Sequence, residues 1–121
     1  RRRDRALLAR YPNAASHARE RGVAVAQVDA TIDMTRKRMA ELIAERKSLD
    51  DELEFYRRDV NRAPAALRRK LEDNTSSMQV QTEFLTAREE EKRRVNARFD
   101  EERDRLRQFW PAMEAAASPA R

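Results

Sequence analysis

An unbroken alternation of three- and four-residue spacings between Val25 and Val60 constrains this chain more than any other feature. Eleven positions follow the spacing, and nine of them are large and apolar. A repeat sustained over five heptads places one apolar stripe along an α-helix and requires a partner helix to cover it. The positions are Val25, Val28, Ile32, Thr35, Met39, Leu42, Arg46, Leu49, Leu53, Tyr56 and Val60. The pattern predicts a helix over about residues 14–60, which would be about 70 Å long.

Residues with known helix-end preferences stand on both sides of this repeat. Asn13, directly after Pro12, is a good N-cap because its side-chain oxygen can accept a bond from an unpaired backbone N–H. Asn61 can adopt the left-handed conformation that closes a helix, and Pro64 suits the first turn of the next one. We therefore expect a turn over about residues 60–64 that joins two antiparallel helices.

A second, weaker repeat predicts the return helix over about residues 64–109. Its thirteen positions keep the same spacing from Leu67 to Phe109, but five of them are polar or charged. Trp110-Pro111 is expected to end the helix, because the residue before a proline is pushed out of the α region. Residues 111–121 are then a flexible tail, and residues 1–12 a short basic helix and linker.

The predicted fold is all-α: a long antiparallel two-helix coiled-coil hairpin over residues 13–110 with a short N-terminal helix. The apolar face is wider than this seam, because Ile43, Phe55, Phe84 and Trp110 lie beside or outside it. Two helices cannot cover that surplus, so we predict self-association, for example a homodimer that forms a four-helix bundle. The expected packing seam consists of Val28, Ile32, Met39, Leu42, Leu49, Leu53, Tyr56, Leu67, Leu71, Met78, Leu85, Val95, Phe99 and Leu106.

The positive charge of the chain is confined to one end. The first 21 residues hold seven arginines against two acidic residues, which equals the net charge of +5 for the whole chain. The remaining residues are balanced and do not form a basic stripe that could follow phosphates. A nucleic-acid partner is therefore not favoured. The alternative is an arm that binds nucleic acid or the ribosome through the basic N-terminus.

The residues that usually carry chemistry are scarce. There is no Cys and only one Gly, so no thiol nucleophile, disulfide framework or phosphate-binding glycine loop is expected. His17 is the only histidine, and it is expected to be an ordinary exposed helix residue because no spacing pairs it with a catalytic partner. The acidic pairs Asp29/Asp33 and Glu41/Glu45 are expected on solvated faces. We expect no enzyme activity, no catalytic residue, no metal and no cofactor.

The compartment is left open by the residues themselves. No apolar run approaches the length of a membrane span, and the opening Arg1-Arg2-Arg3 is not a signal peptide. This opening suggests a fragment or a trimmed chain. Lack of cysteine is compatible with both the cytoplasm and the periplasm.

Three stretches of the chain carry a resemblance to a known group of proteins. They are RRRDRALLARYPN at the front, ELEFYRRDVNRAPAALRRKLEDN around the predicted turn and EKRRVNARFDEERDRLRQFW near the end. Together they resemble the C-terminal helical region of small uncharacterised proteobacterial envelope proteins, which carry an N-terminal domain of unknown function. The resemblance implies a periplasmic or cell-envelope setting and supplies no catalytic residues.

The expected function is that of a non-enzymatic structural or interaction module that spaces or docks another domain through an unidentified protein partner. A holdase-like chaperone that grips clients between hairpin tips is a further alternative. The residue pattern does not identify the partner.

Overall fold

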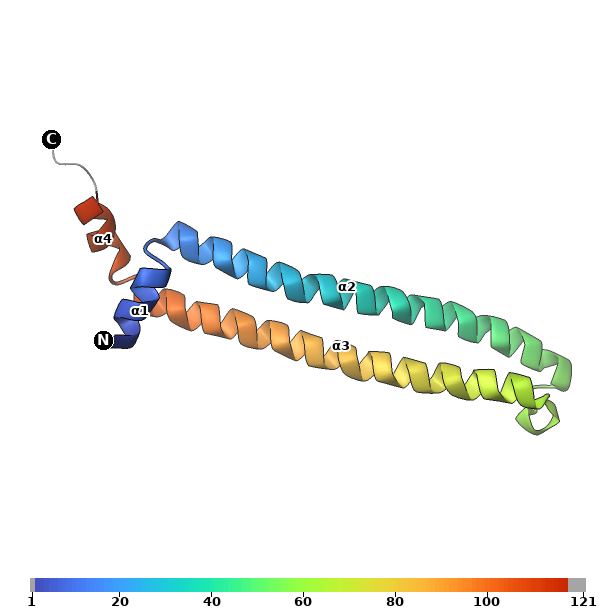
Figure 1. Ribbon diagram of the computed structural model, residues 1–121. Helices are drawn as coiled ribbons and strands as arrows, with labels where there is room; N and C mark the ends of the chain where they lie inside the picture. The colour runs from blue at the N-terminus through green and yellow to red at the C-terminus, as the bar shows by residue number, and fades with distance from the viewer. Residues whose placement is uncertain (1, 118–121) are drawn as a thin grey trace. The chain divides into compact units, whose positions relative to one another are not determined.

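All regular structure in the computed structural model, which describes residues 2–117, is helical, and no strand occurs within this range. The α-helices are α1 (Arg2–Arg10), α2 (Ala14–Leu53), α3 (Ala65–Leu106) and α4 (Trp110–Ala117). Two short 3₁₀ helices, Glu54–Tyr56 and Val60–Arg62, lie between α2 and α3 (Figure 1). The predicted all-α class, with two long helices, is confirmed.

The start of α2 is fixed by a local cap. The Asn13 side-chain oxygen accepts the Ser16 backbone N–H at 2.8 Å, and the Ser16 hydroxyl donates to the Asn13 carbonyl at 2.8 Å. These bonds satisfy polar groups that the first turn of a helix leaves unpaired. The prediction that Asn13 caps this helix is confirmed.

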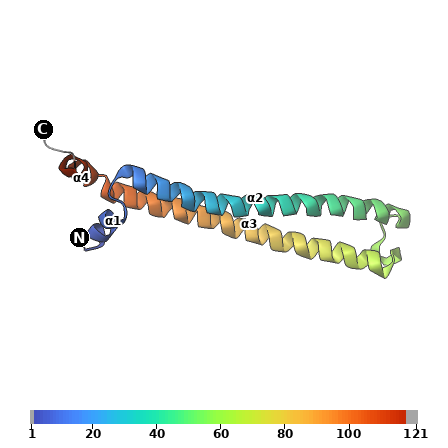
Figure 2. The same cartoon turned by 45° about the horizontal axis from the view of Figure 1, so that its top comes forward.

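The chain divides into two compact units, each of which contains part of both long helices. The terminal unit combines the residues up to Asp29 with those from Glu90 onward, and the turn unit is Ala30–Glu89. Within the turn unit, α2 and α3 lie side by side and are joined at one end by the segment with the 3₁₀ helices (Figure 2).

The core of the turn unit is a strip of aliphatic side chains close to the turn. Leu49 and Leu53 from α2 pack with Leu67 and Leu71 from α3, and with Ala63 before it. Each of these side chains is at most 9% exposed, and Tyr56 covers the cluster from the turn. Burying an aliphatic side chain stabilises a fold by roughly 1.5–3 kcal/mol, so this strip holds the two helices together.

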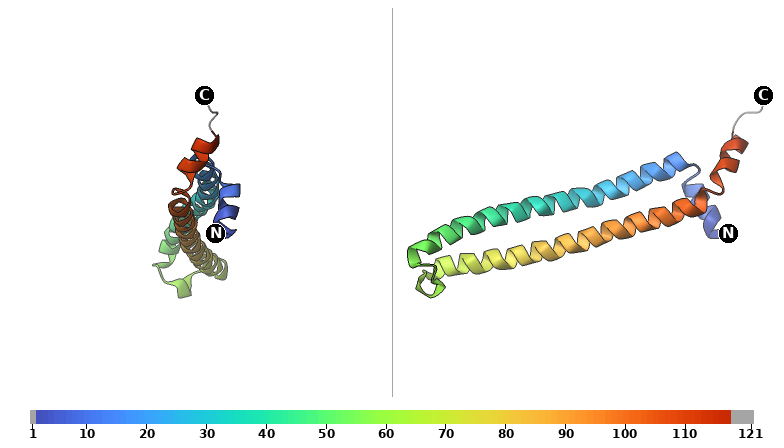
Figure 3. Two further views of the ribbon diagram at one scale, coloured as in Figure 1. Left: turned by 90° about the vertical axis from the view of Figure 1, so that its left-hand side faces the viewer. Right: turned by 180° about the vertical axis from the view of Figure 1, so that it is seen from behind.

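The core of the terminal unit is aromatic rather than aliphatic. Phe99 and Leu106 of α3 are fully buried against Tyr11 and Trp110, which stand just after α1 and at the start of α4. Leu7 and Leu8 of α1 also pack on this cluster, which explains why the short first helix lies against the ends of the longer ones (Figure 3). Residues 2–10 form the short helix that the sequence predicts, and Leu7 and Leu8 are the α1 residues that pack on this cluster.

The turn begins earlier than the sequence predicts. α2 ends at Leu53 instead of continuing to about residue 60, and the left-handed residues are Arg57 and Arg58 rather than Asn61, with φ of 54° and 60°. Backbone bonds hold them: the Arg57 N–H donates to the Glu54 carbonyl at 3.0 Å, and the Arg58 N–H donates to that of Leu53 at 3.1 Å. The earlier end lets Tyr56 fold back onto the aliphatic core. The preference of Asn61 for the left-handed conformation is a local property and does not indicate this packing of Tyr56.

The C-terminal end also differs from the prediction. α3 ends at Leu106 rather than about residue 109, and residues 110–117 form α4 instead of belonging to a flexible tail. Pro111 is tolerated there because the first turn of a helix has no intrahelical use for its missing N–H. Trp110 starts the new helix and is buried. The rest of the expected tail, residues 118–121, lies outside the described residues.

Replacing Leu53 with Ala should lower the free energy of unfolding by about 2–5 kcal/mol, because the change leaves a cavity in the aliphatic core of the turn unit. Urea unfolding followed by helical circular dichroism measures this loss. Ile43→Ala is a matched control, since Ile43 is 60% exposed and its truncation should cost less than about 0.5 kcal/mol. Equal effects of the two substitutions would contradict the assignment of Leu53 to the core.

Candidate functional site

The fourteen residues of the predicted seam all lie at least half-buried. Nine of them are buried and five are half-buried. The half-buried ones are Met39, Tyr56, Met78, Leu85 and Val95. Two polar neighbours on the same stripes, Thr35 and Asn74, are buried as well, at 5% and 4% exposure. The side chains that the pattern selected are therefore used for packing.

His17 is not the exposed residue that the sequence predicts. It is 3% exposed and stands inside an aromatic cage in the terminal unit. Its ring centroid lies 4.8 Å from that of Tyr11, 5.2 Å from Phe99 and 5.6 Å from Trp110. The expectation was wrong because it considered only α2, whereas the turns at residues 11–13 and 107–109 bring two more aromatic rings over this position.

A carboxylate reaches His17 inside this cage. The His17 Nε2 atom lies 3.2 Å from Glu102 Oε1, and the Glu102 side chain is 17% exposed. The pair thus joins α2 to α3 by a hydrogen bond that is shielded from water. One imidazole and one carboxylate are too few for a metal site, and residues 2–117 contain no cluster of three His, Cys, Asp or Glu side chains placed to bind one.

Polar contacts around the cage tie the same helices together. Arg21 lies 2.7 Å from the Asp100 carboxylate and donates to Asn96 Oδ1 at 3.0 Å. The hydrogen bond from Arg21 holds the pKa of Asp100 below its usual value. The Trp110 indole N–H donates to the Tyr11 carbonyl at 2.9 Å, which links the segment after α1 to the start of α4. We call this aromatic cage and its polar contacts the clasp, because together they link the four helices.

The sequence did contain a signal for this clasp. An aromatic residue followed by proline stands at both ends of the long helices, as Tyr11-Pro12 and Trp110-Pro111. Each proline marks a change of chain direction, and each aromatic ring is turned inward. Reading the two pairs together would have placed both rings in one core.

Apolar side chains are exposed to solvent where the chain reverses in the turn unit. Phe55 is 86% exposed and Val60 is 45% exposed. A shallow hollow of about 240 Å³ lies beside Phe55 and is also lined by Glu52, Tyr56, Pro64, Leu67 and Lys70, among others. An aromatic ring left this open on a folded domain is a candidate contact for a partner.

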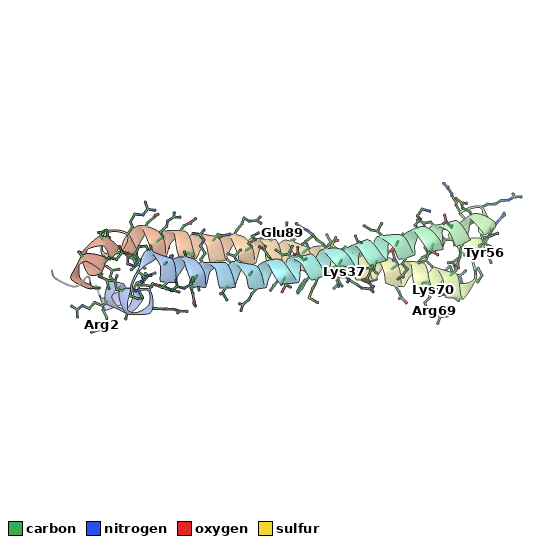
Figure 4. The ribbon with its side chains drawn as sticks, turned by 90° about the horizontal axis from the view of Figure 1, so that it is seen from above. Arg2, Lys37, Tyr56, Arg69, Lys70 and Glu89 are labelled. Carbon is green, nitrogen blue, oxygen red and sulfur yellow. The ribbon has the colours of Figure 1, made fainter. Side chains whose placement is uncertain are left out.

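Several cations lie in the same segment of the chain. Two of them are paired locally, Arg58 with Glu54 at 3.1 Å and Arg62 with Asp59 at 3.4 Å. Arg57, Arg69 and Lys70 are exposed and form no ion pair with the described residues. Figure 4 shows Tyr56 at the turn, with Arg69 and Lys70 farther along α3. We call Phe55, Val60 and these three cations the turn surface.

The comparisons with known proteins give no relative from which a role could be transferred. No protein-family model, curated protein or solved structure matches the chain. Across residues 2–117, none of the helices combines the length and the apolar composition that a membrane crossing requires. The features of this chain that can indicate a role are therefore its two local sites, the clasp and the turn surface.

Burial raises the pKa of Tyr11 above the usual tyrosine value, because the phenolate would be desolvated inside the clasp. In a Tyr56→Phe variant Tyr11 is the only phenol, so ultraviolet absorbance should show a single titration with a midpoint above about 10. The folded state keeps this proton longer than the unfolded chain does, so the free energy of unfolding should fall as the pH rises above about 10. A midpoint at the usual value would contradict the burial of Tyr11.

Proposed function

We propose that the chain is a non-enzymatic structural and interaction module built as an antiparallel helical hairpin. The observation that carries this proposal is the direction of the contacts between α2 and α3. In the turn unit, Arg36 pairs with Glu89 at 3.4 Å and Arg46 donates to Thr75 at 2.8 Å. Residue numbers rise along one helix as they fall along the other.

The terminal unit, taken by itself, has the same direction of pairing. His17 lies against Glu102, and Lys92 pairs with Asp29 at 2.7 Å. Each unit thus uses its apolar residues to pair two helix segments. Because the large side chains are used to pack the helices against each other, contact with other molecules falls to exposed residues. This supports a role in spacing or docking.

A pair of engineered cysteines tests the hairpin in solution. The chain has no native cysteine, so Arg46→Cys with Thr75→Cys should be joined rapidly within one molecule by a short bismaleimide. The matched control is Arg46→Cys with Glu89→Cys, which moves the second thiol by fourteen residues, or about 21 Å, along α3. Equal rates of cross-linking for the two variants, read on denaturing gels, would contradict the antiparallel hairpin.

Self-association into a homodimer is the second part of the proposal. It is supported by apolar side chains along the two long helices that the chain does not cover, namely Ile43 and Phe84, at 60% and 42% exposure. Phe55, which the sequence placed in the same surplus, lies at the turn instead. Trp110, which the sequence placed in the same surplus, is buried in the terminal unit and does not contribute.

Light scattering measures this association directly. The protein should have about twice its chain mass of 14.2 kDa, because covering exposed apolar side chains is favourable. Ile43→Ser and Phe84→Ser should be measured separately. The variant with the lower measured mass identifies which of the two side chains lies in the interface. A mass of one chain at every concentration would remove the dimer from the proposal.

The setting that we propose is the cell envelope, with an unidentified protein partner. The support is the resemblance of the three stretches around the front, the turn and the end of the chain to helical regions of envelope proteins. Co-purification of the partner from envelope extracts, compared with cytoplasmic extracts of the same cells, tests this setting. Recovery of a specific partner from the cytoplasmic extract alone would contradict it.

A further inference from the structure

We propose that the turn surface docks on an anionic phospholipid bilayer, with Phe55 entering the interface and the nearby cations contacting lipid phosphates. The inference rests on the proposed function, since it gives one exposed end of the hairpin a docking partner. Its first support is the exposed apolar side chains at the turn. Phe55 at 86% and Val60 at 45% exposure are uncovered where the chain reverses. A partner that removes both from water must be apolar at the point of contact.

Charge complementarity supplies the second support. Residues 52–70 contain six basic and three acidic side chains, a net charge of +3, and acidic residues flank this range at positions 50, 51, 72 and 73. Two of the acidic groups, Glu54 and Asp59, are already paired with arginines. Arg57, Arg69 and Lys70 are exposed and have no acidic partner among the described residues. The partner should therefore be anionic as well as apolar.

The depth of these groups along α3 fits a lipid interface. α3 begins at Ala65, so Lys70 lies five residues, or about 7.5 Å, along the helix from its start. Apolar faces of interfacial proteins enter the headgroup boundary by about 5–10 Å. Phe55 and Lys70 line the same hollow, together with Glu52. A lipid that covers Phe55 would therefore bring its phosphate within reach of Lys70.

The backbone at the turn gives a third, independent support. Arg57 and Arg58 both have positive φ, a conformation that glycine adopts at lower cost than arginine. Strained residues of this kind occur most often where their side chains have a use. The left-handed backbone places the unpaired Arg57 two residues after Phe55, while Arg58 is paired with Glu54 at 3.1 Å.

A nucleic acid fits the same surface less well. Binding of single strands uses several aromatic rings on which successive bases stack. The turn surface offers one largely exposed ring, Phe55, and one aliphatic side chain, Val60. The two apolar residues instead suit a disordered hydrocarbon interface, which requires no stacking geometry. Nucleic-acid binding is accordingly an outcome that the experiment must be able to detect.

Vesicle co-sedimentation of the full chain tests the proposal. The protein should bind vesicles of phosphatidylcholine mixed with phosphatidylglycerol and should bind pure phosphatidylcholine vesicles much less. Phe55→Ala should weaken binding about tenfold, because the buried apolar area is lost. Arg69→Gln and Lys70→Gln should each weaken it about fivefold, and added salt should weaken it further. Excess glycerophosphate should not compete, since the free headgroup lacks the acyl region.

Two matched controls separate the turn surface from other features. Val80→Ala removes an apolar side chain that is 59% exposed from α3 in the same unit without touching the turn, and it should leave binding unchanged. Arg2→Gln with Arg5→Gln removes two cations from α1 and should change binding less than the turn variants do. Loss of binding confined to the α1 variant would overturn the proposal. Binding equally strong to neutral vesicles, or stronger to single-stranded RNA than to anionic vesicles, would overturn it as well.

The cysteine cross-link distinguishes the failure of this inference from the failure of the proposed function. If vesicle binding is absent while the two introduced thiols of the R46C/T75C variant still cross-link, only the lipid proposal is wrong. If Phe55→Ala abolishes binding but also lowers the helical circular dichroism, the more conservative Phe55→Leu should restore much of the binding. Failure of Phe55→Leu to do so with its helicity intact would contradict insertion of the side chain.

Discussion

Helix–helix burial of a single apolar stripe is the constraint on which the rest of this structure depends. A helix as long as α2 or α3 is not stable in water unless its apolar side is covered. In the turn unit, Leu49 and Leu53 meet Leu67 and Leu71 with almost no exposed surface. Tyr56 covers the same cluster from the turn, so the packing extends to the point where the chain reverses.

Buried polar groups select one pairing among the many that apolar stripes allow. The Asn74 side-chain amide donates to the Leu42 carbonyl at 2.9 Å within the turn unit, and the Thr35 hydroxyl donates to the Thr31 carbonyl of its own helix at 2.8 Å. Sliding α3 along α2 by one turn would leave the Asn74 amide without its partner, and an unsatisfied buried group costs about 1–3 kcal/mol. A polar residue in an apolar seam is therefore a marker of register.

The two units reach stability by different means, and this difference separates their roles. The turn unit relies on aliphatic packing and leaves its reversal open to solvent. The terminal unit encloses His17 among three aromatic rings and joins its helices through Glu102 and the Trp110 indole. We infer that the clasp holds α1 and α4 against the long helices, whereas the turn surface is available for contact with a partner.

The sequence alone determined the helical class, the start of α2, both ends of α3 to within three residues, and the cap at Asn13, because spacing and capping are properties of neighbouring residues. It placed the end of α2 about seven residues too late, and it could not determine the burial of His17 or the reversal at Arg57 and Arg58. Each of these depends on side chains brought together from distant parts of the chain: His17 is buried only because Phe99 and Trp110 lie against it. Local pattern determines which side of a helix is apolar, but only tertiary packing decides which rings cover it and where the chain can accommodate a strained turn.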